Sequence, residues 1–164
     1  MPAPAKTSVV SLREVTKDTV RAICRLKPTP YQERFVAPNA VSIAQAYFQP
    51  EAWFRGIYAD DEPVGFAMLE DWSQVTGVEA QRYRGEPYIG LWRFMIDGRY
   101  QGLGFGRRAL EMLIAHAKSK AGIPQMLLSY VPGEGSPEAL YRSFGFEPTG
   151  DMDENEVIMK RSLT

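Results

Sequence analysis

The sequence predicts an α/β fold in which one mixed sheet carries the helices of a single domain, residues 1–164. The chain has 164 residues, of which 45% are hydrophobic and 24% charged, as in an ordinary globular domain. Strand-like and helical segments alternate along the chain, and one strand runs through a glycine-rich turn into a long helical segment. A long helix placed in this way is expected to cross over to a further strand of the same sheet.

The first part of the chain is expected to form a strand, two helices and a hairpin. Thr16 is expected to cap the first helix and Asn39 the second, and Pro28 and Pro50 end them. The turn at residues 60–63 joins the two strands of the hairpin. The expected elements are a strand at 8–15, a helix at 17–26, an irregular stretch at 27–38, a helix at 39–48, and strands at 53–58 and 64–70.

The second part begins with a polar loop at residues 73–87 and contains the long helix. Leu110, Leu113 and Ala117 form one apolar stripe of this helix, which Gly122 ends. The expected elements are a strand at 88–96, a helix at 104–121, a strand at 126–131, a helix at 136–143, and a final hairpin that follows 144–146 and ends at 157–163. The element order is therefore β-α-α-β-β-β-α-β-α-β-β.

Composition argues against several classes of function. A net charge of -1 and a pI near 5.9 give no electrostatic basis for binding nucleic acid or an anionic membrane. The single Cys24 excludes an internal disulfide and a cysteine-rich zinc site, and no metal is expected. The amino terminus lacks the apolar core of a signal peptide, and no run of about 18 apolar residues could span a membrane. We expect a cytoplasmic protein.

The glycine-rich turn is the most informative feature. Gly102, Gly104 and Gly106 let the main chain approach a ligand closely, and the first amides of the following helix form a site for an anion. Arg107 and Arg108 add positive charge beside it. The turn therefore predicts a phosphate or pyrophosphate ligand. The spacing differs from G-x-G-x-x-G and no Gly-Lys-Ser/Thr follows, which argues against a dinucleotide or a P-loop nucleotide.

Three segments together resemble the GNAT N-acetyltransferase superfamily. Gln101, Gly104 and Gly106 form a Gln-x-x-Gly-x-Gly pattern similar to its acetyl-CoA motif. The strand at 92–97 before the turn and the segment at 140–146 after it stand where that family places them. The resemblance covers nearly the whole chain. It implies a GNAT-type acyl-CoA acyltransferase fold, acetyl-CoA as the cosubstrate, and direct attack of a primary amine in a ternary complex.

The resemblance also assigns roles to individual residues. Tyr141 would lie at the sulfur and act as the general acid, and a main-chain amide near Met95 would bind the oxyanion. Many relatives carry an Asn where this chain has Glu134, so side-chain contacts from that loop to pantetheine are in doubt. A homodimer is expected from the resemblance alone. The residues expected to bind acetyl-CoA are Phe94, Met95 and Ile96 along pantetheine and Gln101, Gly102, Leu103, Gly104, Phe105, Gly106 and Arg107 at the pyrophosphate.

The acceptor is less closely defined. Residues 35–39, 92–97 and 133–137 are similar to the spermine/spermidine acetyltransferase branch, which implies a polyamine or another small alkyl amine. The alternatives are an acetyltransferase for protein amino termini or lysines, and a non-catalytic acyl-CoA-binding sensor.

Because amines titrate near pH 10, a base must remove a proton before attack. Glu70, or its neighbour Asp71, could be this base, and Glu33 could bind the amine. His116 lies late in the long helix and is expected at the boundary of the apolar stripe rather than at the site. Aromatic side chains that could form walls of the acceptor pocket are Tyr31, Phe35, Tyr47, Trp72 and Trp92.

Overall fold

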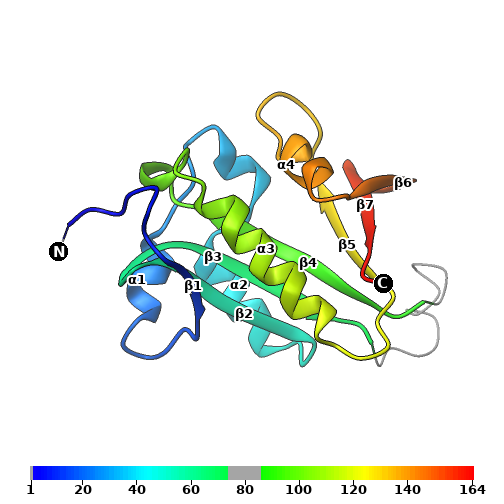
Figure 1. The fold of residues 1–164 in the computed structure, drawn as a ribbon, viewed down its shortest axis with the longest axis horizontal. Coiled ribbons are helices and arrows are strands. Elements are labelled where there is room, and N and C mark those ends of the chain that lie inside the picture. Colours follow the sequence, from blue (N-terminus) through cyan, green and yellow to red (C-terminus); the bar gives the residue numbers. More distant parts are fainter. Residues whose placement is uncertain (1, 74–85) are drawn as a thin grey trace.

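A seven-stranded mixed sheet forms the centre of the computed structural model, which describes residues 2–73 and 86–164 (Figure 1). The strands are β1 (Val10–Arg13), β2 (Ala52–Ala59), β3 (Glu62–Asp71), β4 (Tyr88–Ile96), β5 (Gln125–Tyr130), β6 (Glu147–Asp153) and β7 (Glu156–Ser162). The helices are α1 (Val20–Arg25), α2 (Asn39–Tyr47), α3 (Phe105–Lys118) and α4 (Glu138–Ser143), with 3-10 turns η1 (Gln32–Phe35) and η3 (Gly98–Tyr100). The predicted α/β class and the order of helices and strands are confirmed.

The sheet has two covered faces, each with its own hydrophobic core. On one face Leu110 and Leu113 of α3 pack on Ile89 and Leu91 of β4. On the other face Ile23 of α1 packs with residues of β2, β3 and β4. Figure 1 shows α3 in front of the sheet with α1 and α2 behind it. The apolar stripe predicted for the long helix therefore faces the larger core.

The two halves of the sheet separate where β4 and β5 meet. These strands pair in parallel from Tyr88 to Leu91 of β4, and the paired stretch ends where Leu91 lies opposite Leu128. On the other side of β4 the register with β3 shifts between Met68 and Leu69, so that Trp92 is an extra residue. Beyond this bulge β4 and β5 diverge (Figure 1). The sheet thus contains an opening in the middle of its strand order.

Several local expectations were wrong because hydrogen bonds outside the helices compete with capping. The first helix begins at Val20, since Thr16 donates its main-chain N–H to Thr19 Oγ1 in a preceding turn. Asn39 is the first residue of α2, and its side chain donates to Ile23 O at 2.9 Å rather than capping the helix. The stretch at 27–38, expected to be irregular, contains η1. The predicted loop at 73–87 falls largely on 74–85, outside the described residues.

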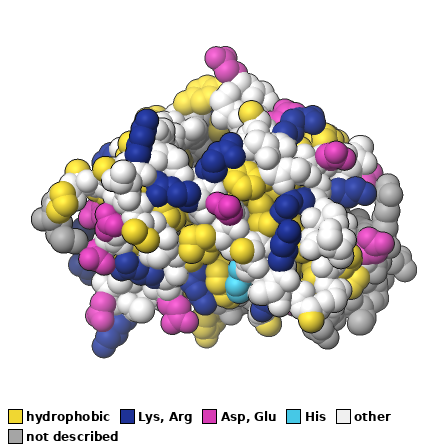
Figure 2. Space-filling view, in the orientation of Figure 1, with side chains coloured by type: hydrophobic (Ala, Val, Ile, Leu, Met, Phe, Trp, Pro, Cys, Tyr) yellow, Lys and Arg dark blue, Asp and Glu magenta, His cyan; other side chains and the backbone are white. Residues whose placement is uncertain are grey.

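Charges of both signs are spread over the face seen in Figure 2, where Lys and Arg alternate with Asp and Glu instead of gathering in one patch. In the part of the chain that the structure describes, every helix is too short or too polar to span a bilayer. Among the same residues no group of three or more His, Cys, Asp and Glu side chains is placed to hold a metal ion.

Candidate active site

A cavity of about 1180 Å³ follows the opening between β4 and β5. At one end it is lined by residues 101–102 and 104–107 of the turn, without Leu103, and along its middle by Phe94, Met95 and Tyr141. At the other end it reaches Glu70 and Glu156. The residues near 28–38 form a further wall. One continuous space therefore joins the predicted anion site to the predicted acceptor carboxylates.

The glycine turn is built as an open cradle of main-chain amides. Gly102 and Gly104 have φ values of 77° and 82°, which side chains other than glycine adopt at a cost. A Cβ atom added at either position would have no atom within 4 Å. Gly104 precedes the first residue of α3, a helix of 14 residues, so the free amides of its first turn and its dipole point into the cradle. The requirement for glycine here is conformational, and the space above the turn is left for a ligand.

The two arginines after the turn have different roles. Arg107 lines the cavity and donates to Ser143 Oγ at 3.0 Å, while its guanidinium lies over the Phe144 ring. The guanidinium of Arg108 instead donates to main-chain carbonyls, including that of Ser8 at 2.6 Å. The Arg108 guanidinium also donates to the carbonyls of Leu103 and Gly104 at 3.3 and 3.4 Å, so its charge lies beside the turn while the same side chain anchors the amino-terminal segment to α3. Leu103 lies partly buried against the core.

Gln101 connects three parts of the site through its side-chain amide. Its Nε2 donates to Gln32 Oε1 at 2.7 Å and to Ile96 O at 3.0 Å. Gln32 Oε1 also accepts from Thr29 N at 3.3 Å. The glutamine of the motif thus ties the end of β4 to the η1 segment, a role that its spacing from the glycines did not indicate.

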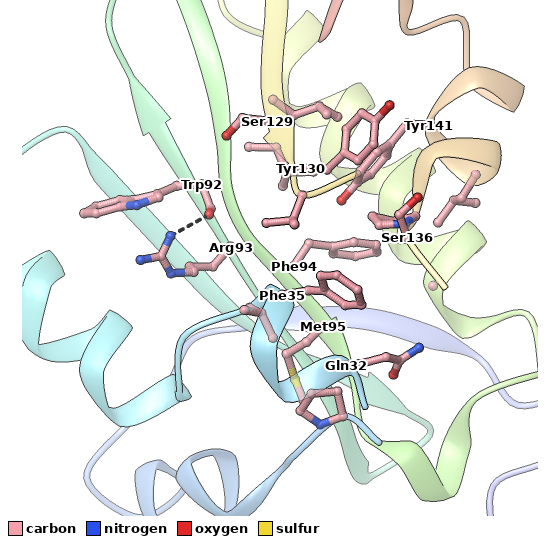
Figure 3. A pocket seen from close by; sticks show the side chains of 18 of the residues that line it. Gln32, Phe35, Trp92, Arg93, Phe94, Met95, Ser129, Tyr130, Ser136 and Tyr141 are labelled. Carbon is pink, nitrogen blue, oxygen red and sulfur yellow. Dashed lines mark hydrogen bonds between the residues drawn. The ribbon is translucent and has the colours of Figure 1, made fainter. Parts of the chain in front are cut away.

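The β4 segment from Phe94 to Ile96 borders the opening in the sheet. Its neighbour across the gap is β5, whose paired stretch with β4 has already ended at this level. Main-chain groups of this segment that face the gap are therefore available to an extended ligand, in the manner of an added strand. Figure 3 shows Phe94 pointing toward Tyr141 and Ser136, while Trp92 and Arg93 leave the strand in the other direction. The strand thus presents different side chains to the two ends of the cavity.

Tyr141 lies in α4 at the centre of the cavity wall and is 6% exposed. Its ring packs near Tyr130 and Phe146, with centroids 6.4 and 6.1 Å away. Burial raises the pKa of its phenol well above the ordinary value near 10. This group is therefore a proton donor over the whole physiological pH range. Burial, followed by a hydrogen bond to Glu138, also raises the pKa of Tyr130.

The structure places both predicted acceptor carboxylates, Glu70 and Glu33, along the cavity. The side chain of Glu70 lies across Gly90, where a Cβ atom would come within 2.7 Å of Glu70 Cγ. Asp71 follows Glu70 on β3 and points to the opposite face of the sheet, where it lines a small cavity with His116. Of the two neighbouring candidates for the base, only Glu70 therefore faces the main cavity.

His116 lies at the far end of α3, as expected. Its ring stacks on Trp53, with centroids 4.1 Å apart and an angle of 18° between the planes. Burial, assisted by the positive charges of Lys120 and Arg55, lowers the pKa of His116. The neutral imidazole is part of the packing between α3 and β2, away from the main cavity.

Sequence reasoning missed several polar residues that the fold brings to the cavity. Glu156 of β7 accepts a hydrogen bond from Ser129 of β5, and both line the acceptor end. Arg93 of β4 lies beside them. Arg93 interrupts the apolar run at 88–96, and this interruption could have been used to predict that it belongs to the site. The other residues could not be found because β5 and β7 are adjacent only in the folded sheet. Of the predicted aromatic walls, Phe35, Trp72 and Trp92 line the cavity.

A contact between distant segments joins two walls of the cavity. Tyr31, just before η1, donates its hydroxyl to the main-chain oxygen of Glu134 at 2.9 Å. Arg34 donates to the same hydroxyl and lies over the Tyr31 ring. A Cβ atom at Gly135 would come within 2.9 Å of Tyr31 Cε1, so glycine is needed for this approach. Glu134, which stands in place of the family asparagine, contributes its carbonyl group to this closure.

The acetyltransferase (GNAT) family matches residues 18–146 of the chain, more than three quarters of its length. The chain belongs to this family. GNAT enzymes are acetyl-CoA-dependent acyltransferases, and the chain is such an enzyme. The predicted resemblance is thereby confirmed.

Individual relatives agree with this assignment. The chain is 29% identical over 159 residues to the spermine/spermidine N(1)-acetyltransferase of Bacillus subtilis (strain 168), covering 94% of this chain and 99% of that protein. Its fold is similar to an aminoglycoside acetyltransferase solved in complex with coenzyme A, with a TM-score of 0.75, 14% identity and coverage of 94% and 95%. An acetyltransferase from Thermus thermophilus has a TM-score of 0.69 at 18% identity, with coverage of 93% and 96%.

The cavity fits the shape and charge of the GNAT cosubstrate. The open amide cradle at Gly102 and Gly104 suits a pyrophosphate, and the gap beside Phe94–Ile96 suits an extended arm with amide groups. Acetyl-CoA supplies the activated acetyl thioester when it is bound there.

Proposed function

We propose that this GNAT enzyme acetylates a polyamine, such as spermidine or spermine, or a closely related small alkyl amine. The observation that carries the proposal is the set of carboxylates from four different elements that line the cavity. Carboxylates gathered in a partly buried space attract ammonium groups more strongly than single surface charges do. The four residues are Glu33, Glu70, Asp153 and Glu156.

Aromatic side chains and the relative from Bacillus subtilis support the same proposal. Trp72 and Tyr88 stack with ring centroids 6.3 Å apart at the acceptor end. Their faces and the apolar side chains Leu127 and Ile158 form a surface for methylene chains and for cation–π contacts. The Bacillus subtilis relative is a spermine/spermidine acetyltransferase. A flexible chain of methylenes and ammonium groups matches this combination of apolar surface and carboxylates.

The proposed reaction is direct attack in a ternary complex. Amides from Gln101 to Arg107 hold the pyrophosphate, and main-chain groups of Phe94, Met95 and Ile96 hold the pantetheine arm. Glu70 removes a proton from the acceptor ammonium, and Glu33 binds the amine. The neutral nitrogen attacks the thioester carbonyl, whose oxyanion is stabilised by a main-chain amide near Met95. As the carbon–sulfur bond breaks, Tyr141 gives its proton to the thiolate, and the proton that the attacking nitrogen loses in forming the amide restores the Tyr141 phenol.

Thiol release from acetyl-CoA, measured with a panel of acceptors, tests this function. We expect turnover with spermidine and spermine to exceed turnover with lysine-containing peptides and with peptides that have a free amino terminus. Faster turnover of the peptides would replace the proposal by protein acetylation. Thermal stabilisation by coenzyme A without turnover of any amine would indicate an acyl-CoA sensor instead.

A further inference from the structure

A guanidinium lies among the carboxylates of the acceptor end. Arg93 of β4 lines the cavity together with Glu70 of β3 and Glu156 of β7. Figure 3 shows its side chain leaving β4 on the side of Trp92, away from Tyr141. A positive charge in this position is unexpected in a site for cationic amines, because it repels the ligand that the carboxylates attract.

The contacts of Arg93 hold it in place without cancelling its charge. Nη1 donates to Trp92 O at 3.0 Å, and Nη2 donates to Gln45 Oε1 at 3.3 Å. Both acceptors are neutral oxygens. The Nε atom is buried and has no hydrogen-bond partner among the residues that the structure describes. The guanidinium is therefore fixed at the bulge of β4 by neutral acceptors, and it remains a positive charge at the cavity wall.

The charges of Glu70, Arg93 and Glu156 alternate in sign across the cavity wall. Burial lowers the pKa of Arg93, and the negative charges of Glu156 and Glu70 act in the opposite direction, so both carboxylates are close enough to influence it. An arginine remains protonated under these conditions. In the strand order, β4 lies next to β3 and two strands from β7. Arg93 therefore lies between Glu70 and Glu156 in the order of the strands, so a chain that crosses the cavity from β3 to β7 passes from a carboxylate over the guanidinium to another carboxylate.

Building on the polyamine function, we propose that Arg93 selects acceptors by the position of their charges. It disfavours amines that carry an ammonium group in the middle of the chain. It favours amines whose charges lie at the two ends, where Glu70 and Glu156 are placed. Arg93 is thus a repulsive specificity element within an attractive site, and the enzyme discriminates among polyamines by what it excludes.

Two acceptors of equal length test this proposal. Spermidine and 1,8-diaminooctane have the same number of chain atoms between their terminal nitrogens, and the diamine has a methylene in place of the secondary ammonium. The measured quantity is the ratio of kcat/KM for spermidine to kcat/KM for the diamine. We expect Arg93→Gln to raise this ratio about tenfold, because it removes one like-charge repulsion in a partly buried site. Each ratio comes from one preparation, so a partly unfolded variant does not distort it.

Arg55 provides a matched control. On β2 it repeats the local contacts of Arg93, since its Nη1 donates to the preceding carbonyl of Phe54 at 2.7 Å and its guanidinium lies over Trp53. It is absent from the residues that line the main cavity. We expect Arg55→Gln to leave the ratio within about twofold of the wild-type value, because Arg55 does not line the cavity that holds the amine. Arg93→Lys keeps a positive charge at the cavity and should retain most of the wild-type selectivity.

Three results would overturn the proposal. An unchanged ratio in Arg93→Gln, with both amines turned over, would reject the role of Arg93 and leave the polyamine function standing. Turnover of neither amine by the wild-type enzyme would reject the polyamine function and this inference together. Faster acetylation of 8-aminooctanoate than of 1,8-diaminooctane would show that the guanidinium binds an anion instead of excluding a cation.

Discussion

At the scale of single residues, the protonation of Tyr141 is the feature on which the proposed chemistry depends. We expect Tyr141→Phe to lower kcat by about 10²-fold, since the departing thiolate loses its proton donor. The dissociation constant of coenzyme A should change little, because the ring stays in place. Steady-state kinetics and isothermal titration calorimetry measure the two quantities. An unchanged kcat would exclude Tyr141 as the acid.

Tyr130 is a suitable control for this substitution. It also lines the cavity, and a hydrogen bond with Glu138 helps to raise the pKa of its phenol. Tyr130→Phe should therefore change kcat by less than about threefold, as expected for the loss of one hydrogen bond. Since burial raises the pKa of Tyr141, the wild-type rate should not decline on the alkaline side before about pH 10. A decline near pH 8 would contradict the assignment.

Glu70 and Asp71 allow the base to be tested by two adjacent substitutions. Glu70 faces the main cavity, whereas Asp71 faces the small cavity beside His116. We expect Glu70→Gln to lower kcat/KM for spermidine by about 10²-fold and Asp71→Asn to change it by less than about threefold. Equal effects of the two substitutions would show that Glu70 has no special role.

Residue roles could be predicted only where a local pattern carried them. The spacing of Gln101, Gly104 and Gly106 was enough to indicate the anion site, because glycine backbone geometry is a local property. The position of Glu156 beside Ser129 had no local signal, since it depends on the pairing of β7 with β5. The second role of Arg108, which anchors the amino-terminal segment, could not be predicted because a charge near a turn does not reveal where a long side chain points.

At the scale of elements, the start of α3 can be tested through its conformation. Gly104 and Gly150 both have positive φ values, and a Cβ atom added to either would meet no atom within 4 Å. Alanine at either position should cost roughly 1–2 kcal/mol of unfolding free energy. Gly150 lies in β6 and does not itself line the cavity. Urea unfolding compares the two variants.

Binding should separate these two glycine variants. We expect Gly104→Ala to weaken coenzyme A binding about tenfold, or ~1.4 kcal/mol, because the cradle amides are redirected. Gly150→Ala should bind coenzyme A as the wild type does. Calorimetric titration would disprove the cradle if both variants bound equally.

Most element types could be predicted because their signals are periodic and their ends carry proline or glycine. The α3 stripe is an example, since its apolar spacing and Gly122 placed the helix to within a few residues. Helix starts were harder to predict. Thr16 and Thr19 bond to one another, and the Asn39 side chain reaches Ile23 O on another helix. Such competition is decided by tertiary contacts that no local pattern shows.

At the scale of the whole molecule, Asp97 links the end of β4 to the segment that follows α1. It is 4% exposed and accepts hydrogen bonds from Lys27 N at 3.0 Å and from Arg99 Nε at 2.8 Å. Burial alone would raise the pKa of Asp97, but the hydrogen bonds from Arg99 and Lys27 outweigh it, and the pKa is lowered. The stabilising contribution is therefore present above the ordinary pKa of Asp, near 3.9, and is lost as pH falls through the lowered value.

We expect Asp97→Asn to reduce the unfolding free energy by about 1–3 kcal/mol at pH 7, with the deficit shrinking below about pH 4. Urea unfolding at pH 7, 5 and 3 measures it. Asp61→Asn is the control, because Asp61 forms an exposed ion pair with Arg13 and should change stability by less than about 1 kcal/mol. An equal loss of unfolding free energy in Asp97→Asn at all three pH values would contradict the role of the negative charge of Asp97.

The overall architecture was predictable in its class and its crossover, but not in its strand order. The sequence places β6 before β7, yet β7 lies between β5 and β6 in the sheet. The bulge at Trp92 and the end of β4–β5 pairing are also long-range features. Resemblance to GNAT enzymes compensated for this, because a family fixes pairings that local patterns leave open.

The opening between β4 and β5 has a consequence for how substrates enter the enzyme and products leave it. The cavity extends from the glycine cradle to the carboxylates at its other end, so under the proposed function the two substrates would approach the reacting atoms from opposite ends. Under the proposed function, an acetylated amine leaves by its own route while coenzyme A is still held at the other. Each product should then compete with its own precursor and not with the other substrate. An inhibitor that joins coenzyme A to a polyamine would have to pass its polyamine chain through the opening between β4 and β5.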